Sequence, residues 1–132
     1  MQNMLNDNLK KTIIFAIVIT LIDGLWLKNY MKYRYQDLFK SLNLKLKGHM
    51  PSIFLAYSTM IAAYPLLVLN VPPKQQLLRS ASLGFVMYGV YGFTLSAILP
   101  KYDLSLALTE AVWGTLLYSV GHKITEYISE KI

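Results

Sequence analysis

Two carboxyl side chains, Asp23 and Glu110, lie inside long apolar stretches of the sequence. Placing an ionisable group within a membrane is energetically costly, so each acid is a candidate functional residue. A tryptophan follows each acid three residues later, at Trp26 and Trp113, and on a helix this spacing puts the acid and the indole on one face. The acids could hold a proton or a cation, or they could supply structural hydrogen bonds to nearby hydroxyls.

The acids belong to a predicted layer of polar groups. Counting 1.5 Å per residue from the expected helix ends places both about 10 Å from the same membrane face. Tyr57 and Thr94 fall at a similar depth, and Tyr88 and Tyr91 repeat the three-residue spacing. Tryptophan also serves commonly as an interfacial anchor. This polar layer comprises Asp23, Trp26, Tyr57, Tyr88, Tyr91, Thr94, Glu110 and Trp113.

The composition indicates that membrane helices position these groups. Of 132 residues, 55% are hydrophobic and only 15% charged, whereas a soluble domain carries about 25% charged residues. Apolar stretches near 12–30, 51–71, 77–99 and 104–122 have about the 20 residues that a bilayer requires. The two later connections are short, so neighbouring helices must be antiparallel. We expect an all-α, multi-pass integral membrane protein with one domain, 1–132, built as an up-down-up-down bundle of four transmembrane helices.

The segment after the first span is amphipathic and basic. Its apolar residues have the i, i+3, i+4, i+7 pattern of a helix that lies on a membrane surface, or that binds a partner. Cations on the other faces could approach anionic headgroups, and they explain much of the net charge of +6 without any nucleic acid. The apolar residues are Tyr35, Leu38, Phe39 and Leu42, and the basic ones are Lys32, Arg34, Lys40, Lys45 and Lys47.

Small residues recur at every fourth position in the third and fourth spans. Such repeats let helix backbones approach closely, either within one chain or between copies. In the second span, Pro65 should kink the helix or free a carbonyl for another partner. The predicted packing residues are Ser80, Gly84, Gly92, Ser96, Ala107, Ala111, Thr115 and Ser119.

The sequence lacks the residues that a catalytic triad, a metal site or a cofactor-binding site would require. His49 and His122 are expected on opposite sides of the membrane, so neither a catalytic triad nor a metal site is predicted from them. The sequence has no cysteine and no cofactor-binding motif. We therefore expect no metal, no cofactor and no enzymatic activity.

Several short motifs resemble one known family. They are Asp23-Gly-Leu-Trp26-Leu27, an aromatic-Gly/Thr-Tyr segment late in the third span, and an acid-x-x-Trp113-Gly114-Thr115 run. Together they are similar to the domain of unknown function 2177 family, small four-helix membrane proteins of bacteria and large DNA viruses. The resemblance implies the fold and the polar layer but no reaction. The chain departs from the family at Tyr91-Gly-Phe-Thr94-Leu, where an acid and an amide are missing, and at Glu110, where the family usually has aspartate.

Three functional hypotheses arise from these features. The leading one is a non-enzymatic scaffold or accessory subunit of a larger membrane or viral assembly, with the lipid bilayer and either further copies or other subunits as partners. The second is a small proton or cation channel or carrier that uses Asp23 and Glu110. The third is a lipid-binding protein or membrane-embedded enzyme with a lipid between Trp26 and Trp113.

Overall fold

The protein is a bundle of long helices. A computed structural model describes residues 2–43 and 49–132, and within these ranges it contains no strand. The amphipathic segment's Lys45 and Lys47 lie outside the described residues. The elements are α1 (Gln2–Trp26), a π-helical turn η1 (Leu27–Met31), α2 (Lys32–Ser41), α3 (Met50–Leu67), α4 (Pro73–Ile98) and α5 (Leu104–Lys131).

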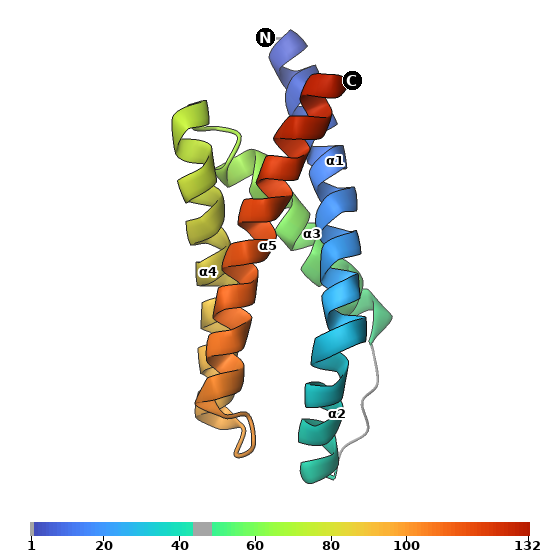
Figure 1. Cartoon of the computed structure of the whole chain (residues 1–132), viewed down its shortest axis with the longest axis vertical. Coiled ribbons are helices and arrows are strands. Elements are labelled where there is room, and N and C mark those ends of the chain that lie inside the picture. The colour runs from blue at the N-terminus through green and yellow to red at the C-terminus, as the bar shows by residue number, and fades with distance from the viewer. Residues whose placement is uncertain (1, 44–48) are drawn as a thin grey trace.

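The helices form an antiparallel bundle with α5 at its centre. Helix α5 packs against α4 on one side and α1 on the other, while α3 packs on α1 and crosses obliquely behind (Figure 1). The N- and C-termini lie at the same end, and the α4–α5 turn lies at the opposite end (Figure 1). The all-α, up-down-up-down architecture predicted from the sequence is confirmed.

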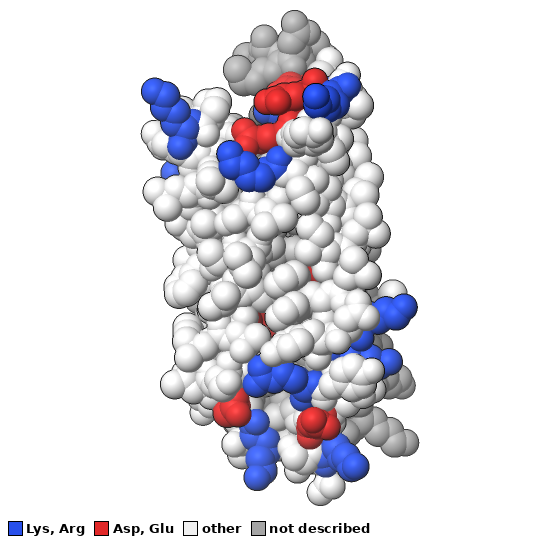
Figure 2. All heavy atoms as spheres, in the orientation of Figure 1, with Lys and Arg blue, Asp and Glu red and all other residues white. Residues whose placement is uncertain are grey.

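The surface is that of a membrane protein. Charged side chains gather toward the two ends, with a broad band of other residues between them (Figure 2). The helical stretches Leu5–Ser41, Met50–Val68 and Pro73–Ile98 are long and apolar enough to cross a membrane. Helix α5 is 28 residues long, but it carries more polar groups than α3 or α4, because much of its surface faces α1 and α4 rather than lipid.

Two helices end away from the limits of their predicted spans. Helix α3 ends at Leu67 instead of continuing to 71, because Pro65 removes a helix donor near its end and Pro72 comes after a short turn. Helix α5 continues to Lys131, nine residues past the expected end of the span at 122. This extension carries Lys123 and Glu126, residues suited to the aqueous side of the interface.

The amphipathic segment differs in direction from the surface helix that we expected. Helix α2 continues α1 through η1 along nearly the same line, instead of forming a separate element that turns onto the membrane surface (Figure 1). Its apolar face packs within the chain, where the buried Leu38 joins Tyr102 and Leu106 in a cluster near the α4–α5 turn. The reason is that α5 offers an apolar face beside α2, and burying both faces is favourable.

The π-helical turn sets the direction of every side chain on α2. A π turn inserts one residue into an α-helix and rotates the downstream helix by about 100°. Without it, Tyr35 would lie about 120° around the helix from Asp23, whereas with it the two lie within about 20°. The turn therefore aims Tyr35 into the bundle on the same face as Asp23.

The small-residue seam joins α4 to α5 within one chain. At the closest crossing, a Cβ built on Gly84 would lie 2.0 Å from the Gly114 carbonyl oxygen, and one on Gly114 would lie 2.4 Å from that of Gly84. Farther along, a Cβ on Gly92 would lie 3.1 Å from the Ala107 backbone. Only glycine permits the first contact, because the two backbones touch directly.

The remaining predicted packing residues lie along the same two helices. Ser80 and Ala111 are buried, whereas Ser96, Thr115 and Ser119 are partly exposed. The hydroxyls of Thr115 and Ser119 donate to the carbonyls four residues earlier in α5. The four-residue repeat is therefore partly a backbone contact and partly a row of hydroxyls satisfied by their own helix.

Candidate functional site

Asp23 is the centre of a hydrogen-bonded site that draws on all four long helices. Its carboxyl, on α1, is only 6% exposed. Oδ1 accepts a hydrogen bond from the indole Nε1 of Trp113 on α5 at 2.9 Å, and the hydroxyl of Tyr88 on α4 lies 3.5 Å from the same oxygen. Oδ2 accepts from the hydroxyl of Tyr57 on α3. One carboxyl thus ties three other helices to α1.

The two tryptophans of the acid-x-x-Trp motifs stack on each other. The ring centroids of Trp26 and Trp113 are 4.2 Å apart with an interplanar angle of 6°, and the ring of Tyr30 also stacks on Trp26, with centroids 4.6 Å apart. A lipid does not fit between rings that are in direct contact. The stack instead holds the Trp113 indole in the orientation that serves Asp23.

Glu110 has a separate partner. Its carboxyl is 4% exposed and accepts a hydrogen bond from the Tyr35 hydroxyl at 2.7 Å. The neighbouring Thr109 hydroxyl accepts from Nη1 of Arg34 at 3.2 Å. Helix α2 is therefore held to the first turns of α5 by polar contacts as well as by its apolar face.

The two motifs do not mirror each other. Trp113 donates to Asp23, but the buried Nε1 of Trp26 finds no acceptor within the described residues. Glu110 takes its hydrogen bond from Tyr35, which the sequence placed in the amphipathic segment and not in the polar layer. The likeness in sequence therefore does not extend to the hydrogen bonds.

Thr94 of the predicted layer lies outside the site, and Tyr91 lies at its edge beside Tyr35 and Glu110. Thr94 is exposed, and Tyr91 is 50% exposed. Thr94 was placed by depth along its helix, and depth does not determine the face on which a side chain lies. Tyr91 was placed by its three-residue spacing from Tyr88. The structure thus places Tyr57, Tyr88 and Trp113 around the carboxyl of Asp23. Glu110 is paired with Tyr35 instead.

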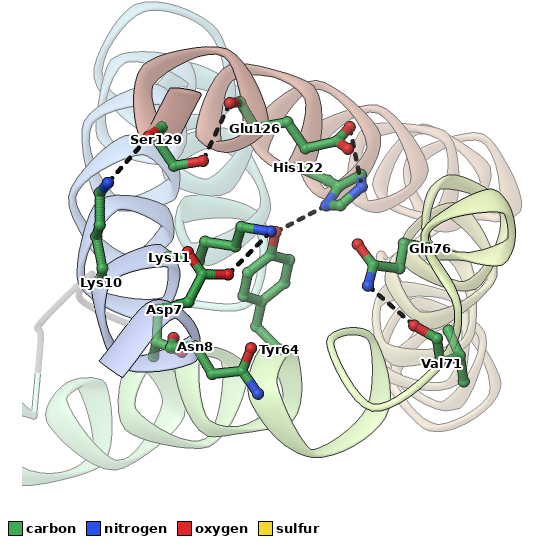
Figure 3. A network of polar contacts seen from close by, with 11 residues as sticks. Asp7, Asn8, Lys10, Lys11, Tyr64, Val71, Gln76, His122, Glu126 and Ser129 are labelled. Carbon is green, nitrogen blue, oxygen red and sulfur yellow. Dashed lines mark hydrogen bonds and ion pairs between the residues drawn. The ribbon is translucent and has the colours of Figure 1, made fainter. Parts of the chain in front are cut away.

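A second polar network lies toward the terminal end and was not predicted (Figure 3). His122 on α5 is 1% exposed, and its Nδ1 lies 2.7 Å from the hydroxyl of Tyr64 on α3. Its Nε2 lies 3.2 Å from Oε1 of Glu126, one turn farther along α5. A Tyr64 donor to Nδ1 and an Nε2 donor to Glu126 would satisfy every group. The sequence offered only a lone histidine, with a partner 58 residues away.

Around this network, side chains close the terminal end of the bundle. Lys10 on α1 donates to the Ser129 carbonyl at 2.9 Å, which joins the first helix to the last (Figure 3). Gln76, near the start of α4, donates to the Val71 carbonyl at 2.9 Å. These contacts lock the helix ends together rather than forming a reactive cluster.

A substitution at Tyr64 can test the hydrogen bond separately from the packing of the ring. It stacks on Phe15 with centroids 3.8 Å apart, so Tyr64→Phe keeps the stack and removes only the hydroxyl. We expect this change to lower the free energy of unfolding by about 1 kcal/mol. His122→Leu should cost more, because it leaves the Tyr64 hydroxyl without its partner and removes one of the two partners of Glu126. Thermal unfolding in detergent measures both, and equal stability of Tyr64→Phe and wild type would contradict the contact.

The geometry and the charge distribution define a polytopic α-helical membrane protein whose buried acids are hydrogen-bonded within the chain. A family model described as "Predicted membrane protein (DUF2177)" matches residues 8–125. The chain belongs to the DUF2177 family. No curated protein and no solved structure gives a significant match.

Proposed function

We propose that this protein is a non-enzymatic membrane scaffold or accessory subunit. The observation that carries the proposal is the state of Asp23, whose two carboxyl oxygens are engaged by side chains from three other helices. A transport or catalytic acid needs a free position for its ion or substrate. Here the donors occupy the carboxyl, so its task is to fix the helices relative to one another.

The outer surface agrees with this role. Helix α1 exposes one large apolar residue at every fourth position, and α5 does the same, which gives each helix an apolar ridge that winds around it and faces lipid or neighbouring proteins. The ridges contain no acid or base. Their members are Leu5, Leu9, Ile13, Ile17, Leu21 and Leu25 on α1, and Leu104, Leu108, Val112, Leu116 and Val120 on α5.

The size of the particle in native membranes tests the proposal. A scaffold extracted in mild detergent should run as an oligomer or with partners, well above the 15.1 kDa of one chain. The double variant Asp23→Asn, Glu110→Gln should keep the particle size, because each amide keeps one acceptor oxygen and its NH2 can donate to a tyrosine hydroxyl. A wild-type protein that is monomeric and without partners at every detergent concentration would end the proposal.

A proton or cation carrier is the competing function. The observation in its favour is that Asp23 and Glu110 are both buried and that each contacts tyrosine hydroxyls, which can pass protons. The two functions differ in one property. A carrier moves charge across a bilayer and loses that activity when its acids are neutralised, whereas a scaffold moves none.

A further inference from the structure

An open apolar groove runs along the outer side of α5, next to the stacked indoles. It encloses about 500 Å³. All of its lining comes from α5 except for one indole from α1. The lining residues are Trp26, Ser105, Leu108, Thr109, Val112, Trp113 and Leu116.

The groove is polar at one end and apolar at the other. Ser105 and Thr109 lie in the first turns of α5, next to the membrane face that carries the α4–α5 turn, while Val112 and Leu116 lie deeper. At 1.5 Å per residue, the groove extends about 16 Å from Ser105 to Leu116. Its long axis therefore runs in the direction of a lipid chain, from the interface toward the middle of the bilayer.

A cation lies at the polar end. Nη1 of Arg34 donates to the Thr109 hydroxyl at 3.2 Å, which holds the guanidinium at the rim of the groove. Within the described residues no carboxylate forms an ion pair with Arg34, and the carboxyl of Glu110 accepts from Tyr35 instead. A guanidinium has five N–H donors in a planar fork, so the bond to Thr109 leaves donors for a phosphate.

Further cations lie close along the same helix. Lys28 and Lys32, together with Tyr35, line a second, smaller pocket of about 390 Å³ on α1, η1 and α2. Lys28 lies near the end of the predicted first span, and Lys32 and Arg34 follow it, so the three cations are near the headgroups on the side of the α4–α5 turn. Basic pockets between transmembrane helices are a recurring way to bind anionic headgroups.

We propose that this groove is a specific site for an anionic phospholipid in the leaflet on the α4–α5 turn side. Arg34 binds the phosphate, the hydroxyls of Ser105 and Thr109 lie beside the same headgroup, and one acyl chain occupies the apolar part along Leu108, Val112 and Leu116. The site is independent of the scaffold role. It requires only that the helices be assembled as they are here.

The chain carries its own reporters for this site. Its two tryptophans, Trp26 and Trp113, both line the groove. Bromine atoms on an acyl chain quench tryptophan fluorescence on contact, so quenching by brominated lipids measures how much of the groove is occupied by lipid. The protein is placed in bilayers of unbrominated phosphatidylcholine, and brominated phosphatidylglycerol or brominated phosphatidylcholine is titrated in at constant total lipid.

The expected result is a preference for the anionic lipid that depends on Arg34. Brominated phosphatidylglycerol should reach half-maximal quenching at a mole fraction about fivefold lower than brominated phosphatidylcholine. Arg34→Gln should remove the preference, and Arg34→Lys should keep part of it because the charge remains. Arg79→Gln, at an exposed arginine near the start of α4, is the control that should retain it.

Three outcomes would contradict the proposed phospholipid site. They are equal quenching by both lipids in the wild type, a preference that survives Arg34→Gln, or one that Arg79→Gln removes to the same extent. The tryptophan emission maximum before lipid addition shows whether each variant keeps the indole stack. If a variant loses the indole stack, Thr109→Val is used in its place. This change removes the acceptor for Arg34 and should weaken the preference for the anionic lipid.

Discussion

Gly84→Leu is expected to prevent the native bundle from forming. The first atom of any side chain at this position would lie 2.0 Å from the Gly114 carbonyl oxygen, a backbone atom that cannot rotate away. Helices α4 and α5 would have to separate along the seam, which breaks the packing on either side. We expect a loss of more than about 3 kcal/mol in the free energy of unfolding. Unfolding by a denaturing detergent, monitored by circular dichroism, measures it.

Gly24→Ala is the matched control. A Cβ at Gly24 meets no atom within 4 Å, and alanine favours a helix by about 1 kcal/mol over glycine, so this variant should be as stable as the wild type or more stable. Gly114→Ala should behave as Gly84→Leu does, in milder form. If Gly84→Leu unfolded at the wild-type detergent concentration, the close crossing of α4 and α5 would be refuted.

Asp23→Leu is expected to give the second-largest loss of stability. Leucine has no acceptor, so the hydroxyl of Tyr57 and the indole N–H of Trp113 would lose their partner inside the bilayer. Interhelical hydrogen bonds in membranes contribute about 0.6 kcal/mol each on average and up to about 1.7, so we expect a loss of about 1–3 kcal/mol. Asp23→Asn should cost less, because its amide oxygen still accepts.

Thr94→Val is the control for this series. Thr94 lies in a transmembrane helix at a depth similar to Asp23, but its side chain is exposed on the outer surface. The change should be nearly neutral, within about 0.5 kcal/mol. A result in which Asp23→Leu is as stable as Thr94→Val would show that the Asp23 hydrogen bonds do not hold the helices together.

The spans and the α4–α5 seam could be predicted because each depends on short, regular patterns. An apolar run of about 20 residues specifies a membrane helix whatever its neighbours are. Small residues at every fourth position mark a close contact, and Gly84 and Gly92 lie in one. The same pattern did not mark Gly114, the direct partner of Gly84, because this glycine falls between the small residues that repeat on α5.

The members of the site were harder to predict because depth and direction are separate properties. Sequence position gave the depth of Asp23, Tyr57 and Thr94, but Thr94 faces outward. Tyr35 could not be placed opposite Glu110, since the π-helical turn that rotates it leaves no simple signal in the sequence. His122 needed a tertiary partner, and that is a property of the folded chain.

Proton flux in liposomes tests most directly the claim that the buried acids are structural. Purified protein is reconstituted with a pH-sensitive dye inside the vesicles, and a pH step is applied at several starting pH values. We expect the dye response to equal that of empty liposomes for the wild type and for the double variant Asp23→Asn, Glu110→Gln. Flux in the wild type that disappears in the double variant would contradict the account and make Asp23 and Glu110 the route for protons.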